Sequence, residues 1–139
     1  MKVGIVEQAS GAVAVVHPAS GFTVQEVLIR MGETGFEMEY VDLPTDDMLF
    51  NSWVIDAAGT GVMVDMTKAK LIVSTALMSG FDMSIDAIAN PLAEAQDDSN
   101  TLLVNNLVNH RKSLRSAKTM KQLEIDACTT AAQLTALMP

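Results

Sequence analysis

This chain of 139 residues has few cysteines, few aromatic residues and few basic residues, and each shortage excludes something. Cys128 is the single cysteine, so no disulfide can form within the chain, and its apolar helical surroundings predict a small buried side chain. Aromatic residues make up 4% of the chain, so aliphatic residues and ten methionines must supply the core. Hydrophobic residues reach 49%, which is enough for a folded domain rather than a disordered segment.

Nine basic residues stand against seventeen acidic ones, which gives a formal net charge of −8. This balance argues against general binding to nucleic acid, whose backbone repels an acidic protein. The charge is also uneven: residues 1–56 carry nine acidic and two basic groups, whereas five of the nine basic groups lie between Arg111 and Lys121. Both patches are compatible with solvated surfaces, and the basic cluster could also meet the acidic part of a neighbouring copy.

Long apolar runs are missing as well. No stretch reaches the roughly 18 apolar residues of a membrane span. The closest candidate, Lys68–Met83, is bracketed by Lys68, Lys70 and Asp82. No basic start is followed by an apolar segment, so we expect no signal peptide, no membrane partner and synthesis in a cytosol.

The first half of the chain predicts a small α+β lobe over residues 1–66. Thr23 and Glu26 form a capping-box pattern that begins a helix ending near Met31, where Gly32 follows. Short β-branched or alternating runs predict five strands, at Lys2–Glu7, Ala12–Val16, Phe36–Tyr40, Trp53–Asp56 and Val62–Met66.

From residue 67 the apolar spacing becomes helical, which predicts a helical hairpin region over residues 67–139. Pro91 should kink or restart the first helix, and the polar stretch Asp97–Asn100 should separate it from a helix over Thr101–Arg115. Basic residues would then occupy the last turn of that helix, where they favour the helix dipole. A second capping box at Thr130 predicts a short terminal helix. The fold class is therefore α+β, with a β-rich lobe followed by a helical hairpin.

No catalytic, cofactor or metal site is predicted. His17 and His110 are far apart and lack a second ligand at metal-binding spacing. Asp42, Asp46 and Asp47 could hold a calcium ion, but their order differs from that of an EF-hand. No nucleophile motif or phosphate-binding glycine loop occurs, so we predict that the protein is not an enzyme.

Recognition of another protein is the remaining prediction. One helical stripe of apolar and histidine side chains lies beside a dense basic cluster, and the sole Trp either anchors the core or belongs to an interface, where Trp is enriched. The predicted interface residues are Trp53, Leu103, Leu107, His110, Arg111, Lys112, Leu114 and Arg115.

Four stretches of the chain, in order, resemble segments of small tailed-bacteriophage proteins. They are Val3–Glu7 with Val15–Pro18, Tyr40–Asp46 with Phe50–Trp53, Val64–Lys70, and His110–Arg115 with Ala127–Thr130, Leu134 and Leu137. The second stretch is similar to a "DLP-x-D…F-x-x-W" segment and the third to a "VDM-x-KA" helix start. Together they span nearly the whole chain and resemble phage tail-region proteins, some of which are called tail fibre assembly proteins or tail assembly chaperones.

The resemblance implies a structural component of the virion, in the tail or fibre-attachment region, made in the host cytoplasm and without enzymatic activity. Its partners would be other phage structural proteins (tail, fibre or adaptor subunits), with self-association also open. An assembly chaperone and a head decoration protein are the alternatives. The chain departs from the pattern of these proteins in one respect. They often carry a strongly basic helix after the "KA" start, whereas Leu71–Ala89 of this chain has no basic residue. This difference suggests that the helix is buried in its own core or against a neighbour.

Overall fold

The computed structural model describes all residues from Met1 to Pro139. The chain divides into two compact units, Met1–Ala69 and Lys70–Pro139, which are described separately below. The expected boundary after Met66 lies three residues before this division, because the helix α2 (Met66–Asp86) begins at the end of the first unit and continues into the second.

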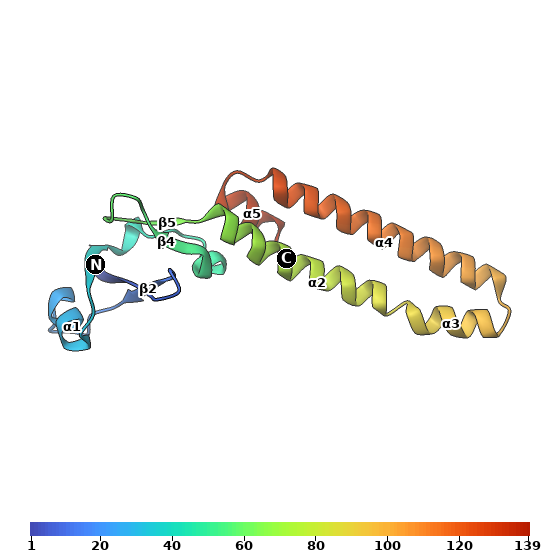
Figure 1. Ribbon diagram of the computed structural model, residues 1–139, viewed down its shortest axis with the longest axis horizontal. Coiled ribbons are helices and arrows are strands. Elements are labelled where there is room, and N and C mark those ends of the chain that lie inside the picture. The colour runs from blue at the N-terminus through green and yellow to red at the C-terminus, as the bar shows by residue number, and fades with distance from the viewer. The chain divides into compact units, whose positions relative to one another are not determined.

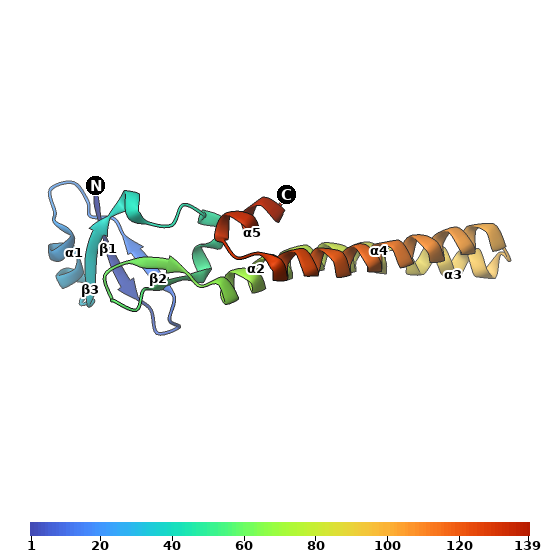
Figure 2. The ribbon, with the colours of Figure 1, turned by 90° about the horizontal axis from the view of Figure 1, so that it is seen from above.

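A three-stranded antiparallel sheet with the order β2-β1-β3 forms the centre of the first unit (Figures 1 and 2). It consists of β1 (Lys2–Glu7), β2 (Val13–Val16) and β3 (Gly35–Glu39). The central strand β1 is covered on both faces, since successive side chains of a strand point to opposite sides. Val3 and Ile5 lie in one buried cluster with Trp53, whereas Val6 lies in another with residues of the helix α1 (Val24–Met31).

The capping box predicted for α1 is present. Thr23 Oγ1 accepts a hydrogen bond from the Glu26 backbone N–H at 3.2 Å, and Glu26 Oε2 accepts one from the Thr23 N–H at 2.8 Å. Gly32 ends the helix with a φ of 70°, a left-handed conformation that glycine adopts without steric cost. Val24 and Leu28 are the helix residues that become buried.

Two short 3-10 helices, η1 (Tyr40–Asp42) and η2 (Asp47–Ser52), lead from β3 to a second sheet. That sheet is the predicted hairpin of β4 (Trp53–Ile55) and β5 (Val62–Val64). Tyr40, expected at the end of a strand, instead begins η1 and is exposed. The chain turns there because the antiparallel pairing of β1 with β3 ends at Glu39, opposite Lys2.

The second unit is an antiparallel helical hairpin with a short terminal helix (Figure 1). Its first arm is α2 followed by α3 (Ala89–Asp97), and its second arm is α4 (Thr101–Ala127). Pro91 lies in the first turn of α3, where its missing N–H leaves no helical hydrogen bond unmade, so the helix restarts rather than kinks at this proline. The terminal helix α5 (Ala131–Leu137) begins at the predicted Thr130 capping box.

The expected end of α4 at Arg115 is wrong, because the helix continues to Ala127. Residues 116–127 contain neither Gly nor Pro and are rich in good helix formers, so nothing in the backbone stops the helix at Arg115. The basic residues therefore lie in the middle of α4, away from the end at which a helix dipole acts. The predicted α+β class, with a small N-terminal sheet region and a C-terminal helical hairpin, is confirmed.

Candidate functional site

The longest helix of the protein buries almost nothing. Of the 27 residues of α4, Ile125 alone is buried. Helices of globular proteins gain most of their stability from packing of an apolar face, so a helix this long is expected to bury a stripe along its whole length. The surface of α4 is therefore available for packing that this chain does not supply within the unit.

The reason is geometric: a hairpin of two helices has a single seam that is open on both flanks. Val73, Ile88, Leu92 and Ala95 of the first arm are buried. Eight other apolar residues at helical spacing on the two arms are only half-buried. They are Leu77, Met78, Phe81 and Ile85 on α2, and Val104, Leu107, Val108 and Leu114 on α4. A third helix or a strand laid along one flank would cover them.

An open surface pocket of about 330 Å³ lies between α2 and α4 and is lined by Met78, Lys118, Thr119, Gln122 and Leu123. Polar contacts join the two helices around it. The Ser74 hydroxyl donates to Gln122 Oε1 at 2.6 Å, and the Lys118 ammonium pairs with the Asp82 carboxylate. These two contacts join the arms of the hairpin beside the pocket.

Other apolar side chains of this unit point to solvent. Leu102 is 73% exposed and Met83 is 71% exposed, and Leu71, Leu123 and Met120 are also largely exposed. The interpretation that Leu71–Ala89 is buried in the protein's own core is thus wrong for most of its residues, because a two-helix layer has no second layer to cover it. Cover by a neighbouring subunit remains a prediction.

The predicted interface residues of α4 lie on more than one face. Leu107 and Leu114 belong to the half-buried seam, whereas Leu103 and His110 are exposed. The stripe facing α2 and α3 is displaced by about one position from the predicted one and includes Val104 and Val108. Two apolar spacings overlap in this helix, and the sequence does not show which of them faces the opposite arm.

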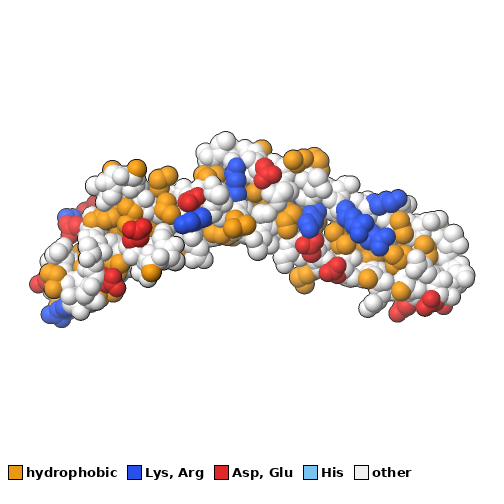
Figure 3. Space-filling model, in the orientation of Figure 1, with side chains coloured by type: hydrophobic (Ala, Val, Ile, Leu, Met, Phe, Trp, Pro, Cys, Tyr) orange, Lys and Arg blue, Asp and Glu red, His pale blue; other side chains and the backbone are white.

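The basic residues of α4 fall into two groups. Lys118 and Lys121 form ion pairs with Asp82 and Glu124. Arg111, Lys112 and Arg115 form none; Arg111 is half-buried with its Nε atom unpartnered, and the other two are exposed. Figure 3 shows Lys and Arg side chains gathered among hydrophobic ones on the visible face of the helical unit.

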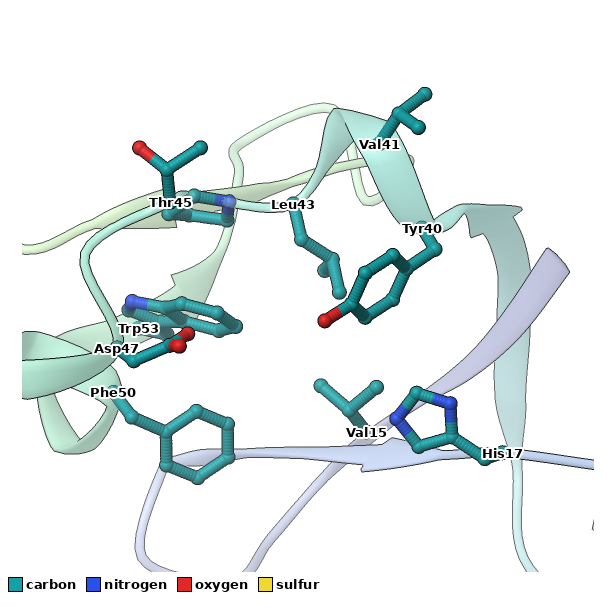
Figure 4. A pocket seen from close by; sticks show the side chains of 10 residues that line it. Val15, His17, Tyr40, Val41, Leu43, Thr45, Asp47, Phe50 and Trp53 are labelled. Atoms are coloured by element: carbon teal, nitrogen blue, oxygen red, sulfur yellow. The ribbon is translucent and has the colours of Figure 1, made fainter. Parts of the chain in front are cut away.

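A second candidate site is an open pocket of about 490 Å³ in the first unit (Figure 4). Its walls are aromatic: His17 and Tyr40 pack with tilted rings at 5.6 Å between centroids on one side, and Phe50 and Trp53 pack with tilted rings at 4.9 Å on the other. Leu43 contributes an apolar surface, and Asp47 contributes a carboxylate to the lining. The hydroxyl of Tyr40 points into the space between the two aromatic pairs.

Trp53 packs in the core of the first unit and also lines the pocket, whereas its role in an interface remains a prediction. It is 3% exposed and packs in the core cluster with Val3, Ile5 and Val13, and one of its faces lines the pocket. Its indole Nε1 is buried without a hydrogen-bond partner, whereas buried indole N–H groups usually have one. The neighbouring residues of the pocket were missed from the sequence, because β2, η1 and η2 bring them together from separate segments.

No group of three or more His, Cys, Asp or Glu side chains is arranged to hold a metal ion. Of the three acidic residues considered for calcium, Asp47 lines the aromatic pocket. Cys128 is buried as predicted, and its thiol donates to the Glu124 carbonyl at 3.2 Å.

One helical stretch, Met66–Asp97, is long and apolar enough to span a membrane when judged by length and composition alone. Only 11% of its most apolar window is buried, so the protein's own core covers little of it. Length and composition are weak grounds for a membrane span, since helices of other kinds satisfy them too.

Comparisons with models of protein families, with curated proteins and with solved structures find no match for this chain.

Proposed function

We propose that this protein is a structural component of a bacteriophage particle, in the tail or fibre-attachment region, and that it acts through contacts with other phage structural proteins. The observation that carries the proposal is the exposure of α4, which buries only Ile125 among its 27 residues. Interfaces between permanently associated subunits resemble a domain core cut in half, and the half-buried apolar residues of the hairpin support a role as such a surface.

The assignment to a phage particle is supported by the four ordered stretches that resemble tail-region proteins. The third of these, Val64–Lys70, is the segment in which β5 leads into α2, and the last includes the middle of α4 and the start of α5. The resemblance therefore extends to the element whose surface is exposed.

Mass spectrometry of purified particles of the phage that encodes this chain tests the proposal. We expect the protein in stoichiometric amounts relative to known tail proteins, and in tail fractions after heads and tails are separated. Presence in the lysate but absence from particles would reject the proposal in favour of an assembly chaperone. Recovery with heads would favour a decoration protein.

A pair of adjacent substitutions tests the role of the seam. Leu107 is half-buried at the seam and its neighbour Asn106 is exposed. Leu107→Glu and Asn106→Glu therefore add the same charge at adjacent positions along α4, one on the seam and one on the exposed side. We expect Leu107→Glu to reduce incorporation into particles by about tenfold or more, as for loss of a central interface contact, and Asn106→Glu to leave it unchanged. Circular dichroism of both variants shows whether the hairpin still folds, and Leu103→Glu, at a more exposed position, repeats the test if it does not.

A further inference from the structure

The first unit is strongly acidic and contains an aromatic pocket. Residues 1–69 carry ten acidic and three basic side chains. Asp47, which lines the pocket, has no ion-pair partner. Aromatic faces and a carboxylate at one opening are the groups that bind an organic cation, since the ring faces are electronegative and the carboxylate supplies a counter-charge.

Among the cations, a guanidinium fits these walls best. The two aromatic pairs stand on opposite sides of the opening, so a planar group can enter between them (Figure 4). Guanidinium stacks on aromatic faces and is less strongly hydrated than an ammonium, which lowers the cost of removing it from water.

The chain itself carries three basic side chains without an ion pair, and two of them are guanidinium groups. Arg111, Lys112 and Arg115 form no ion pair, and Lys112 and Arg115 are exposed three positions apart on one side of α4. In contrast, Lys118 and Lys121 on the same helix are neutralised within the unit.

We propose that the aromatic pocket of one copy receives the Arg115 side chain of a second copy, with Lys112 meeting the acidic surface of the first unit around Asp47. The two surfaces that meet in this contact are different. A copy bound through one such contact still has one free pocket or basic segment, so association proceeds head to tail into a ring or a filament unless two copies exchange both contacts in a closed dimer. This contact does not depend on which particle, if any, contains the protein.

Sedimentation of the full-length protein over a range of concentrations, at low and high salt, tests the contact with two variants. The basic-segment variant is Lys112→Glu with Arg115→Glu, and the pocket variant is Tyr40→Ala with Asp47→Lys; all four side chains are exposed, so folding should be kept. We expect the wild type to grow in mass with concentration and to dissociate with added salt. Each variant alone should be monomeric, with association weakened by about tenfold or more.

Mixing the two variants is the decisive experiment. Each keeps one intact surface, so an equimolar mixture should form a one-to-one dimer that grows no further. Trp53 is the only Trp and lines the pocket, so its fluorescence should change when this dimer forms. The control variant is Lys2→Glu with Arg30→Glu. It changes the net charge by the same amount as the basic-segment variant but lies outside α4, so it should still assemble.

Two results overturn the contact: a wild type that stays monomeric at every concentration, or a closed dimer that both variants leave intact. Neither result bears on the presence of the protein in virions, which mass spectrometry decides separately. Circular dichroism and Trp53 fluorescence of each variant show that it is folded before it is compared.

Discussion

At the scale of single residues, two glycines of this chain differ in whether a larger side chain would fit. Gly35 begins β3 opposite Val6, and a Cβ atom there would lie 2.2 Å from the carbonyl oxygen of Ile5. Gly80 lies within α2, and a Cβ atom there would have no atom within 4 Å. The first glycine is therefore needed for close approach of two backbones, and the second is not.

We predict that Gly35→Ala destabilises the first unit by about 2 kcal/mol or more, because a backbone atom cannot move aside as a flexible side chain does. Gly80→Ala should stabilise the helical unit by about 1 kcal/mol, since alanine is the better helix former. Urea denaturation measures both, with Trp53 fluorescence reporting on the first unit and circular dichroism on the helices. Equal effects of the two substitutions would contradict this assignment.

At the scale of elements, the start of α1 depends on a charge. Hydrogen bonds from the Thr23 backbone N–H and hydroxyl to the Glu26 carboxylate lower the pKa of Glu26 from its ordinary value of 4.5. The charged carboxylate thus stabilises the folded unit above the pKa of the unfolded chain, and this contribution is lost as the pH falls through the lower pKa of the folded state.

We predict that Glu26→Gln flattens the dependence of the first unit's stability on pH between about pH 5 and about pH 3. Glutamine can still cap the helix at this position, so α1 itself should persist at neutral pH. Denaturation midpoints across this range measure the effect. A pH profile identical to that of the wild type would show that Glu26 contributes nothing through its charge.

The element α4 contains a second pair of contrasting positions. Ile125 is 0% exposed and Leu123, two residues earlier, is 58% exposed. We predict that Ile125→Ala lowers the free energy of unfolding of the helical unit by about 2–4 kcal/mol, because it opens a cavity in packed surroundings. Leu123→Ala should change it by less than about 0.5 kcal/mol. Thermal unfolding followed by circular dichroism tests both, and a large loss at Leu123 would mean that it packs within the unit.

At the scale of the whole molecule, the apolar stretch Met66–Asp97 raises the question of a membrane. Asp82 and Asp86 lie within it, and a charged carboxylate near the centre of a bilayer costs roughly 3 kcal/mol. We predict that the purified protein does not bind lipid vesicles in a flotation assay, because the carboxylates of Asp82 and Asp86 oppose insertion of this stretch into a bilayer. Flotation with vesicles that persists at high salt would contradict this prediction.

The elements that sequence reasoning located correctly are those with a local cause. The first hairpin follows from β-branched runs around a turn, and both capping boxes follow from residues three positions apart. The end of α4 was misplaced because a basic cluster resembles the last turn of a helix, although nothing after Arg115 prevents the helix from continuing.

Local pattern along the chain thus determined the α+β class, the order of the elements and the burial of Cys128, because propensity, capping and apolar spacing act over a few residues. Only the tertiary structure decided that His17, Tyr40, Asp47 and Phe50 line one pocket with Trp53, since separate segments must fold before these side chains meet. It also decided which side of α4 faces the opposite arm, and that the helix stays mostly uncovered. Those two outcomes depend on packing between distant segments, which the periodicity of a single helix does not specify.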